Sequence, residues 1–98
     1  MGVMNMNDQL EEIIKYFGKE KQIIKCVEEL SELQKELCKS VNGKGNLDNI
    51  IEEIADVEIM LKQIKIIFKI GARDVLKEKN KKIKRTLNYI NEKSKESI

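Results

Sequence analysis

Acidic side chains gather in two short stretches of this chain, at spacings that suit a cation site. The first stretch contains Glu28, Glu29 and Glu32, and the second contains Glu53 and Asp56. Carboxylates three or four residues apart lie on one side of a helix, where like charges repel unless a cation lies between them. Several carboxylate oxygens around one small volume suit Mg²⁺, or Mn²⁺ in its place. Because such ions promote hydrolysis of phosphoanhydride bonds, this is the chemistry that the residues indicate.

The longest apolar-periodic segment, residues 49–70, is expected to form one central helix because it contains no Pro or Gly before Gly71. One apolar side is expected to pack on its own chain and consists of Ile50, Ile54, Val57, Leu61, Ile64 and Phe68. A second apolar side is expected to pack on another chain and consists of Ile59, Met60, Ile66, Ile67 and Ile70. Glu53 and Asp56 continue the line of Met60 and Gln63, which predicts partly enclosed carboxylates that need a cation or hydrogen-bond donors.

Three further helices are expected around the central one. A short helix is capped by Asp8 and stops at Gly18, and a second helix covers about residues 20–40. The inward face of that second helix is predicted to be Ile23, Cys26, Val27, Leu30, Leu33 and Leu37. The turn 41–46 has two Gly and two Asn, Asn46 or Asp48 caps the central helix, and a fourth helix follows Gly71. The prediction is an all-α, compact four-helix-bundle subunit, a single domain over 1–98 with 1–7 and 91–98 flexible.

Composition restricts the classes of function. The 98 residues include 19 basic and 17 acidic side chains, a net charge of +2 that is too balanced to indicate nucleic-acid binding. No apolar run approaches the length of a membrane span, so no membrane partner is expected. Cys26 and Cys38 lie about 18 Å apart along one helix, too far for a disulfide, and are expected to be buried thiols of a cytoplasmic protein. The absence of His removes His-based catalysis and most zinc sites.

The acidic stretches form a recognisable pair of motifs. Glu28-Glu29-x-x-Glu32, followed by Glu53-x-x-Asp56, resembles the EExxE…ExxD signature of MazG-like nucleotide pyrophosphohydrolases. The flanking segments VEELSEL and IEEIADV are similar to the two signature helices of that family, and the resemblance extends over about residues 10–87. It implies an all-α homodimer or tetramer that cleaves a nucleoside triphosphate to the monophosphate and pyrophosphate with Mg²⁺.

The same resemblance implies roles for individual residues. Glu28, Glu29, Glu32, Glu53 and Asp56 would bind the metal ion and orient the attacking water. Lys25 on the second helix, with Lys79 and Asn80 on the fourth, would bind the phosphates of the substrate. A snorkelling Lys at a helix edge is the alternative interpretation of Lys79.

Other functions stay open on the sequence alone. The acidic set could be an ordinary solvated and ion-paired helix surface. The chain could instead be a phosphoribosyl-ATP pyrophosphohydrolase, although the central helix lacks the His expected in that relative. A third alternative is a dimeric helical module that binds or regulates without catalysis.

Overall fold

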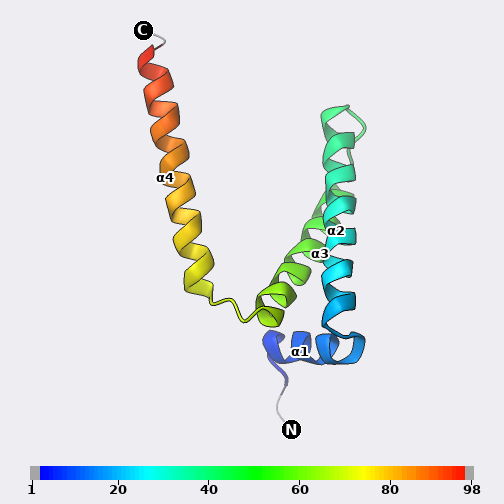
Figure 1. Cartoon of the computed structure of the whole chain (residues 1–98). Coiled ribbons are helices and arrows are strands. Elements are labelled where there is room, and N and C mark those ends of the chain that lie inside the picture. The colour runs from blue at the N-terminus through cyan, green and yellow to red at the C-terminus, as the bar shows by residue number, and fades with distance from the viewer. Residues whose placement is uncertain (1–2, 97–98) are drawn as a thin grey trace.

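The structure is a computed structural model that describes residues 3–96, and it is helical throughout apart from short connections. Four helices follow one another along the chain: α1 (Met6–Phe17), α2 (Lys19–Val41), α3 (Leu47–Ile67) and α4 (Ala72–Glu96) (Figure 1). No strand occurs between residues 3 and 96, which confirms the all-α prediction. The flexibility predicted for Met1, Gly2, Ser97 and Ile98 concerns residues outside the described part of the chain.

The first helix lies across one end of the α2–α3 pair (Figure 1). Its N-cap is Asn5, whose Oδ1 accepts from the Asp8 backbone N–H at 2.8 Å, so the prediction of Asp8 as the cap is wrong by one turn. Gly18 ends the helix as predicted, since its N–H donates to the Ile14 carbonyl at 2.8 Å. Its φ of 94° lies where side chains other than hydrogen are strained, so the chain can turn directly into α2 there.

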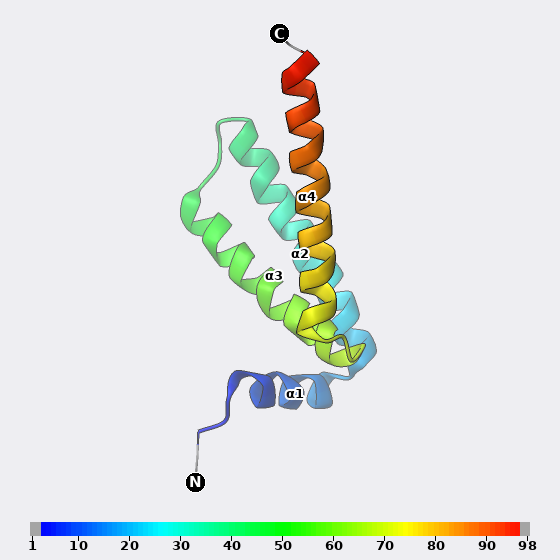
Figure 2. The same ribbon diagram turned by 90° about the vertical axis from the view of Figure 1, so that its left-hand side faces the viewer.

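Helices α2 and α3 form an antiparallel hairpin closed by the predicted turn (Figure 2). Gly45 is required in this turn, because a Cβ there would lie 2.6 Å from the Ser40 Cα. Asn46 caps α3 as predicted, and its Oδ1 accepts from the Asn49 N–H at 3.2 Å. Helix α3 ends at Ile67 rather than at the predicted residue 70, because Lys69 adopts a left-handed φ of 55°.

The interior of the hairpin is smaller and more polar than the sequence suggests. The buried apolar residues of the described chain are Leu10, Ile14, Cys26, Val57 and Met60. Three buried polar residues, Gln22, Glu36 and Gln63, lie among them. The second thiol, Cys38, is exposed, so the prediction that both cysteines are buried holds only for Cys26.

The side of α3 that packs on its own chain differs from the prediction. Met60, assigned to a partner-facing side, is buried within this chain, and Ile66 and Ile67 are half-buried. Exposed instead are three members of the side predicted to be internal: Ile54, Leu61 and Phe68. On α2, Val27, Leu30 and Leu37 are likewise exposed although predicted to face inward. The predicted packing face of each of these two helices is therefore rotated by about one residue from the observed one.

The fourth helix stands apart. Within residues 3–96, α4 packs against none of the other three helices, and Val75 is the only half-buried residue of this otherwise exposed helix (Figure 1). The radius of gyration is 18.0 Å, whereas a compact domain of this size has about 13 Å. The prediction of a compact four-helix bundle within one chain is therefore wrong for α4. The fourth helix continues to Glu96 and so includes residues 91–96 of the predicted flexible tail.

None of the helices in the described part of the chain is long and apolar enough to cross a membrane.

Candidate functional site

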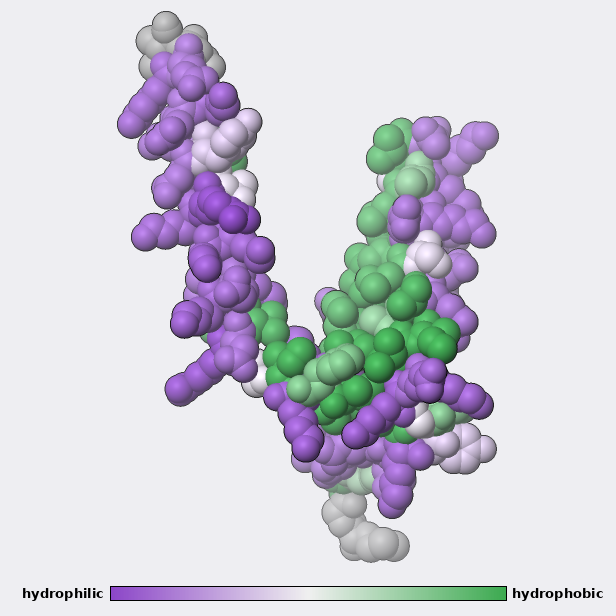
Figure 3. All heavy atoms as spheres, viewed as in Figure 1, coloured by the Kyte–Doolittle hydropathy of each residue, from purple (hydrophilic) through white to green (hydrophobic). Residues whose placement is uncertain are grey.

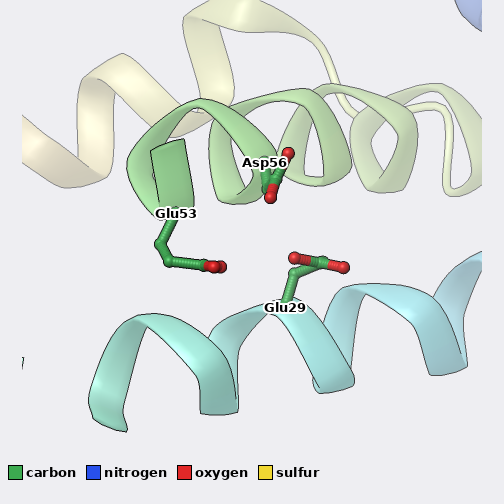
Figure 4. A group of neighbouring side chains, drawn as sticks. All are labelled: Glu29, Glu53 and Asp56. Carbon is green, nitrogen blue, oxygen red and sulfur yellow. The ribbon is translucent and has the colours of Figure 1, made fainter. Parts of the chain in front are cut away.

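Three carboxylates meet between the two helices of the hairpin. Glu29 projects from α2, and Glu53 and Asp56 project from α3, one turn apart (Figure 4). Each residue offers one oxygen to a group whose members all lie within 4.8 Å of one another. All three residues are half-buried. The antiparallel packing of α2 on α3 thus produces the convergence that the sequence predicts for these three residues.

Burial and mutual repulsion make this cluster electrostatically unfavourable when it is fully ionised. Desolvation raises the pKa of Glu53 above its ordinary 4.5, and the charges of Asp56 and Glu29 add to the effect. Desolvation likewise raises the pKa of Asp56 above 3.8, followed by repulsion from Glu29. Removal from water disfavours a carboxylate, and so does a neighbouring negative charge. The positive charge of Lys25, which lowers the pKa of Asp56, therefore does not fully offset the negative charge of the cluster.

One oxygen of the cluster has no partner at all among the described residues. Glu53 Oε2 is buried and forms no hydrogen bond. An ionised oxygen in such a place costs free energy unless a donor or a cation reaches it. Three convergent carboxylates with an unsatisfied oxygen fit the all-oxygen ligand set that Mg²⁺ and Mn²⁺ prefer.

Lys25 supplies the nearest positive charge. Its Nζ lies 3.2 Å from Glu29 Oε1 and 3.9 Å from Glu28 Oε2. The hydrogen bond with Glu29 raises the pKa of Lys25, and the charges of Glu29, Glu28 and Asp56 contribute in the same direction. More than half of the Lys25 side chain is solvent-exposed, so this ion pair is easily exchanged for another partner.

The remaining predicted ligands lie at the margin of the cluster. The Glu28 side chain is 62% exposed, and its Oε2 lies 3.9 Å from Lys25 Nζ. Glu32 is also exposed, although its charge contributes to the raised pKa of Glu53. Glu36, one turn beyond Glu32, is buried and pairs with Lys39 at 3.3 Å, so it does not extend the exposed Glu28 and Glu32 into a surface row. The motif thus has an inner part, Glu29, Glu53 and Asp56, and an exposed outer part, Glu28 and Glu32.

The two predicted phosphate ligands on the fourth helix are far from this site within one chain. Lys79 and Asn80 belong to α4, which packs on neither α2 nor α3. Both residues are exposed. The structure therefore does not bring them to the carboxylates of their own chain.

Sequence reasoning missed the buried pair Gln22 and Gln63. Gln22 Nε2 donates to Gln63 Oε1 at 2.8 Å, and Gln63 Nε2 lies 3.6 Å from Met60 Sδ. Gln22 lies seven residues before Glu29, and Gln63 lies seven residues after Asp56. In an antiparallel pair of helices, the two amides and the two carboxylates therefore lie along the same line of contact. This heptad spacing of polar residues was the available signal.

A groove lies next to the cluster on the side of α1. Its volume is about 540 Å³, and its lining includes Phe17, Gln22, Lys25, Glu28 and Gln63. Most of its exposed wall is apolar, with amide and charged groups at defined places, which is typical of small-molecule sites. The groove and the carboxylates share Lys25 as a common border.

Comparisons with models of protein families, with curated proteins and with solved structures found no match to this chain.

Proposed function

We propose that this protein is a Mg²⁺-dependent nucleoside triphosphate pyrophosphohydrolase. The observation that carries the proposal is the meeting of Glu29, Glu53 and Asp56 from two helices within 4.8 Å, with one buried oxygen unsatisfied. The resemblance of the EExxE…ExxD motif pair to MazG-like enzymes supports the same chemistry. An ordinary solvated acidic surface explains these features less well, because the three residues are half-buried and face one another.

In this proposal the chain's own residues have distinct tasks. Glu29, Glu53 and Asp56 would hold the cation, and the exposed Glu28 and Glu32 would complete its ligand set or orient the attacking water. When bound, Mg²⁺ or Mn²⁺ offsets phosphate charge and lowers the pKa of a coordinated water. Lys25 changes partner from Glu29 to a substrate phosphate, which its exposure permits. The neighbouring groove of about 540 Å³ accepts the nucleoside.

The reaction consumes one water for each triphosphate. The anhydride bond between the α and β phosphates breaks, and the products are a nucleoside monophosphate and pyrophosphate. The expected partners are a ribo- or deoxyribonucleoside triphosphate and further copies of the chain, as a homodimer or a tetramer. The site of action is the cytoplasm.

Asp56→Asn tests the assignment directly. The substitution keeps the size of the side chain and removes one charge from the cluster, so we expect turnover to fall at least a hundredfold, about 2.7 kcal/mol of transition-state stabilisation. Glu58→Gln is the matched control, because Glu58 lies two residues further on α3 and is exposed. It should retain the wild-type rate, and both variants should retain wild-type helicity.

The assay is a panel of canonical and modified triphosphates, with phosphoribosyl-ATP included, read out as pyrophosphate and as orthophosphate. Pyrophosphate release that depends on Mg²⁺ and on Asp56 supports the proposal. Equal losses in the two variants, or orthophosphate as the sole product, would place the site or the chemistry elsewhere. Activity confined to phosphoribosyl-ATP would favour the relative in histidine synthesis, and no activity on the panel would favour a non-catalytic module.

A further inference from the structure

One face of the α2–α3 hairpin is apolar and uncovered. On α2, Val27, Leu30, Leu37 and Val41 recur at alternating steps of three and four residues, with Gln34 completing the series. On α3, Leu47, Ile51, Ile54, Leu61 and Phe68 follow the same heptad positions, and the charged residues Glu58 and Lys65 complete that series. These apolar residues are exposed, from 41% for Ile54 to 88% for Val41. Such spacing is the heptad pattern of a helix that packs against another helix.

Both series lie on the same side of the hairpin. Leu30 and Leu37 each follow a residue of the α2 contact line, Glu29 and Glu36, and Ile54 follows Glu53 in the same way on α3. In antiparallel helices, a step of one residue turns both side chains toward the same face. Figure 3 shows this apolar surface over α2 and α3, on the side of the hairpin that is turned toward α4. Along α2 the surface is hollowed into a groove of about 510 Å³.

The fourth helix carries a matching face. Leu76, Ile83, Leu87 and Ile90 recur with the same heptad spacing and are each 53–59% exposed. Asn80 is the single polar residue within this series. The 25 residues of α4 extend about 37 Å and the 23 residues of α2 about 35 Å, so the two faces have nearly equal length. The apolar faces of α4 and of the hairpin thus fit each other, yet they do not meet within one chain.

Charge decides which surface suits α4. Helix α4 carries nine basic and four acidic side chains, a net charge of +5. The hairpin over residues 19–67 carries ten acidic and eight basic side chains, a net charge of −2. Its negative charge is concentrated from Glu28 to Glu58, where there are nine acidic and three basic side chains. Two hairpins placed face to face would bring like charges together, and so would two α4 helices. A hairpin and an α4 helix attract each other.

We propose that α4 is an exchanged arm that docks on the apolar α2–α3 face of a second copy of this chain, while the second copy's α4 docks on the first. The heptad series of α4 packs along those of α2 and α3, and its Lys77, Lys79 and Lys84 flank the acidic hairpin. Each copy then buries the two faces that a single chain leaves exposed. The exchange is reciprocal, as a two-fold dimer requires. In this arrangement Asn80 lies inside the interface and fixes the register of α4.

Two single variants and their mixture test the exchange. Ile83→Asp places a charge on the α4 face, and Leu37→Asp places one on the hairpin face; both residues are exposed, so each chain should keep its helicity. Asn88→Asp adds the same charge to the opposite side of α4 and is the control. Association is measured by sedimentation at micromolar concentration, independently of any catalytic assay, so its outcome does not depend on the proposed activity.

We expect wild type and Asn88→Asp to sediment at twice the 11.4-kDa chain mass, and the dissociation constant of each single variant to rise at least a hundredfold. An equimolar mixture of the two variants should regain association, because the intact α4 of Leu37→Asp meets the intact hairpin face of Ile83→Asp. A dimer that survives Ile83→Asp means that hairpins pair with each other, and one that survives Leu37→Asp means that α4 helices pair. Either result overturns the proposal, as does a mixture without recovery or a wild-type chain that stays monomeric because α4 folds back on its own hairpin.

Discussion

Gln22 and Gln63 form a buried hydrogen bond that offers a sharp test of how the hairpin is held in register. Gln63 is 2% exposed and Gln22 is 6% exposed, and the bond between them is 2.8 Å long. Replacing Gln63 by Leu leaves the Gln22 amide without an acceptor in a buried place. An orphaned group of this kind costs about 1–3 kcal/mol, whereas replacing both partners by apolar residues is close to neutral.

We therefore expect Gln63→Leu and Gln22→Leu each to lower the free energy of unfolding by about 1–3 kcal/mol. For a chain of this size, the melting temperature would fall by roughly 4–24 °C. The double variant should recover most of that loss. The measurement is a double-mutant cycle by chemical denaturation at one fixed protein concentration, because association also changes apparent stability.

The double variant also has a second readout, which concerns the carboxylates. Without a directional bond, α3 can shift along α2, and Glu29 would no longer lie opposite Asp56, one heptad away. We expect a stable double variant with a smaller Mg²⁺-dependent gain in melting temperature than wild type. If the single variants are as stable as wild type, the two buried amides do not depend on each other for a hydrogen bond, and the reasoning is refuted. A double variant that loses the sum of both costs would refute it equally.

Two further predictions concern the ionisation of the cluster. Mg²⁺ should stabilise the folded chain by about 2.7 kcal/mol at a concentration one hundred times its dissociation constant. In a thermal melt, Glu53→Gln should remove most of this stabilisation. Glu32→Gln, at an exposed residue, should only reduce it. The raised pKa values of Glu53 and Asp56 predict that the metal-free protein loses stability as pH rises from their ordinary values of 4.5 and 3.8 through the raised ones, because the folded state binds more protons there. Denaturation of wild type and Asp56→Asn across this pH range, without divalent ions, should give a flatter profile for the variant; identical profiles would contradict the assigned repulsion.

The sequence was sufficient for the helices and for the inner carboxylates. Gly18 and the turn 41–46 separate the first three helices as predicted, and Asn46 caps α3. The half-burial of Glu53 and Asp56 followed from their place on the line of Met60 and Gln63. These features depend on local backbone chemistry and on the helical period, which a single sequence contains.

The side on which each helix packs could not be predicted, and the reason is physical. Helix α3 is apolar around much of its circumference, so its periodicity does not distinguish the face toward α2 from the face toward a partner. On α2, the apolar series that begins at Val27 is the more hydrophobic one, yet the contact line with α3 contains Gln22, Glu29 and Glu36. The expectation that the most apolar face packs within the chain placed Val27, Leu30 and Leu37 inward, although all three are exposed. It also treated α4 as part of a self-contained bundle.

The α2–α3 hairpin has polar residues along its contact line and apolar residues on an exposed face, the reverse of an ordinary pair of packed helices. Its contact line repeats polar residues every heptad, at Gln22, Glu29 and Glu36 on one helix and at Asp56 and Gln63 on the other, while its apolar series are exposed. Burial of polar groups costs free energy unless they find partners, and exposed apolar faces gain free energy when they are covered. A cation between the carboxylates would relieve the first cost, and an α4 helix from a second copy would provide the second gain. The two proposals thus account for the contact line and for the uncovered apolar face of the same hairpin, and each can fail without the other.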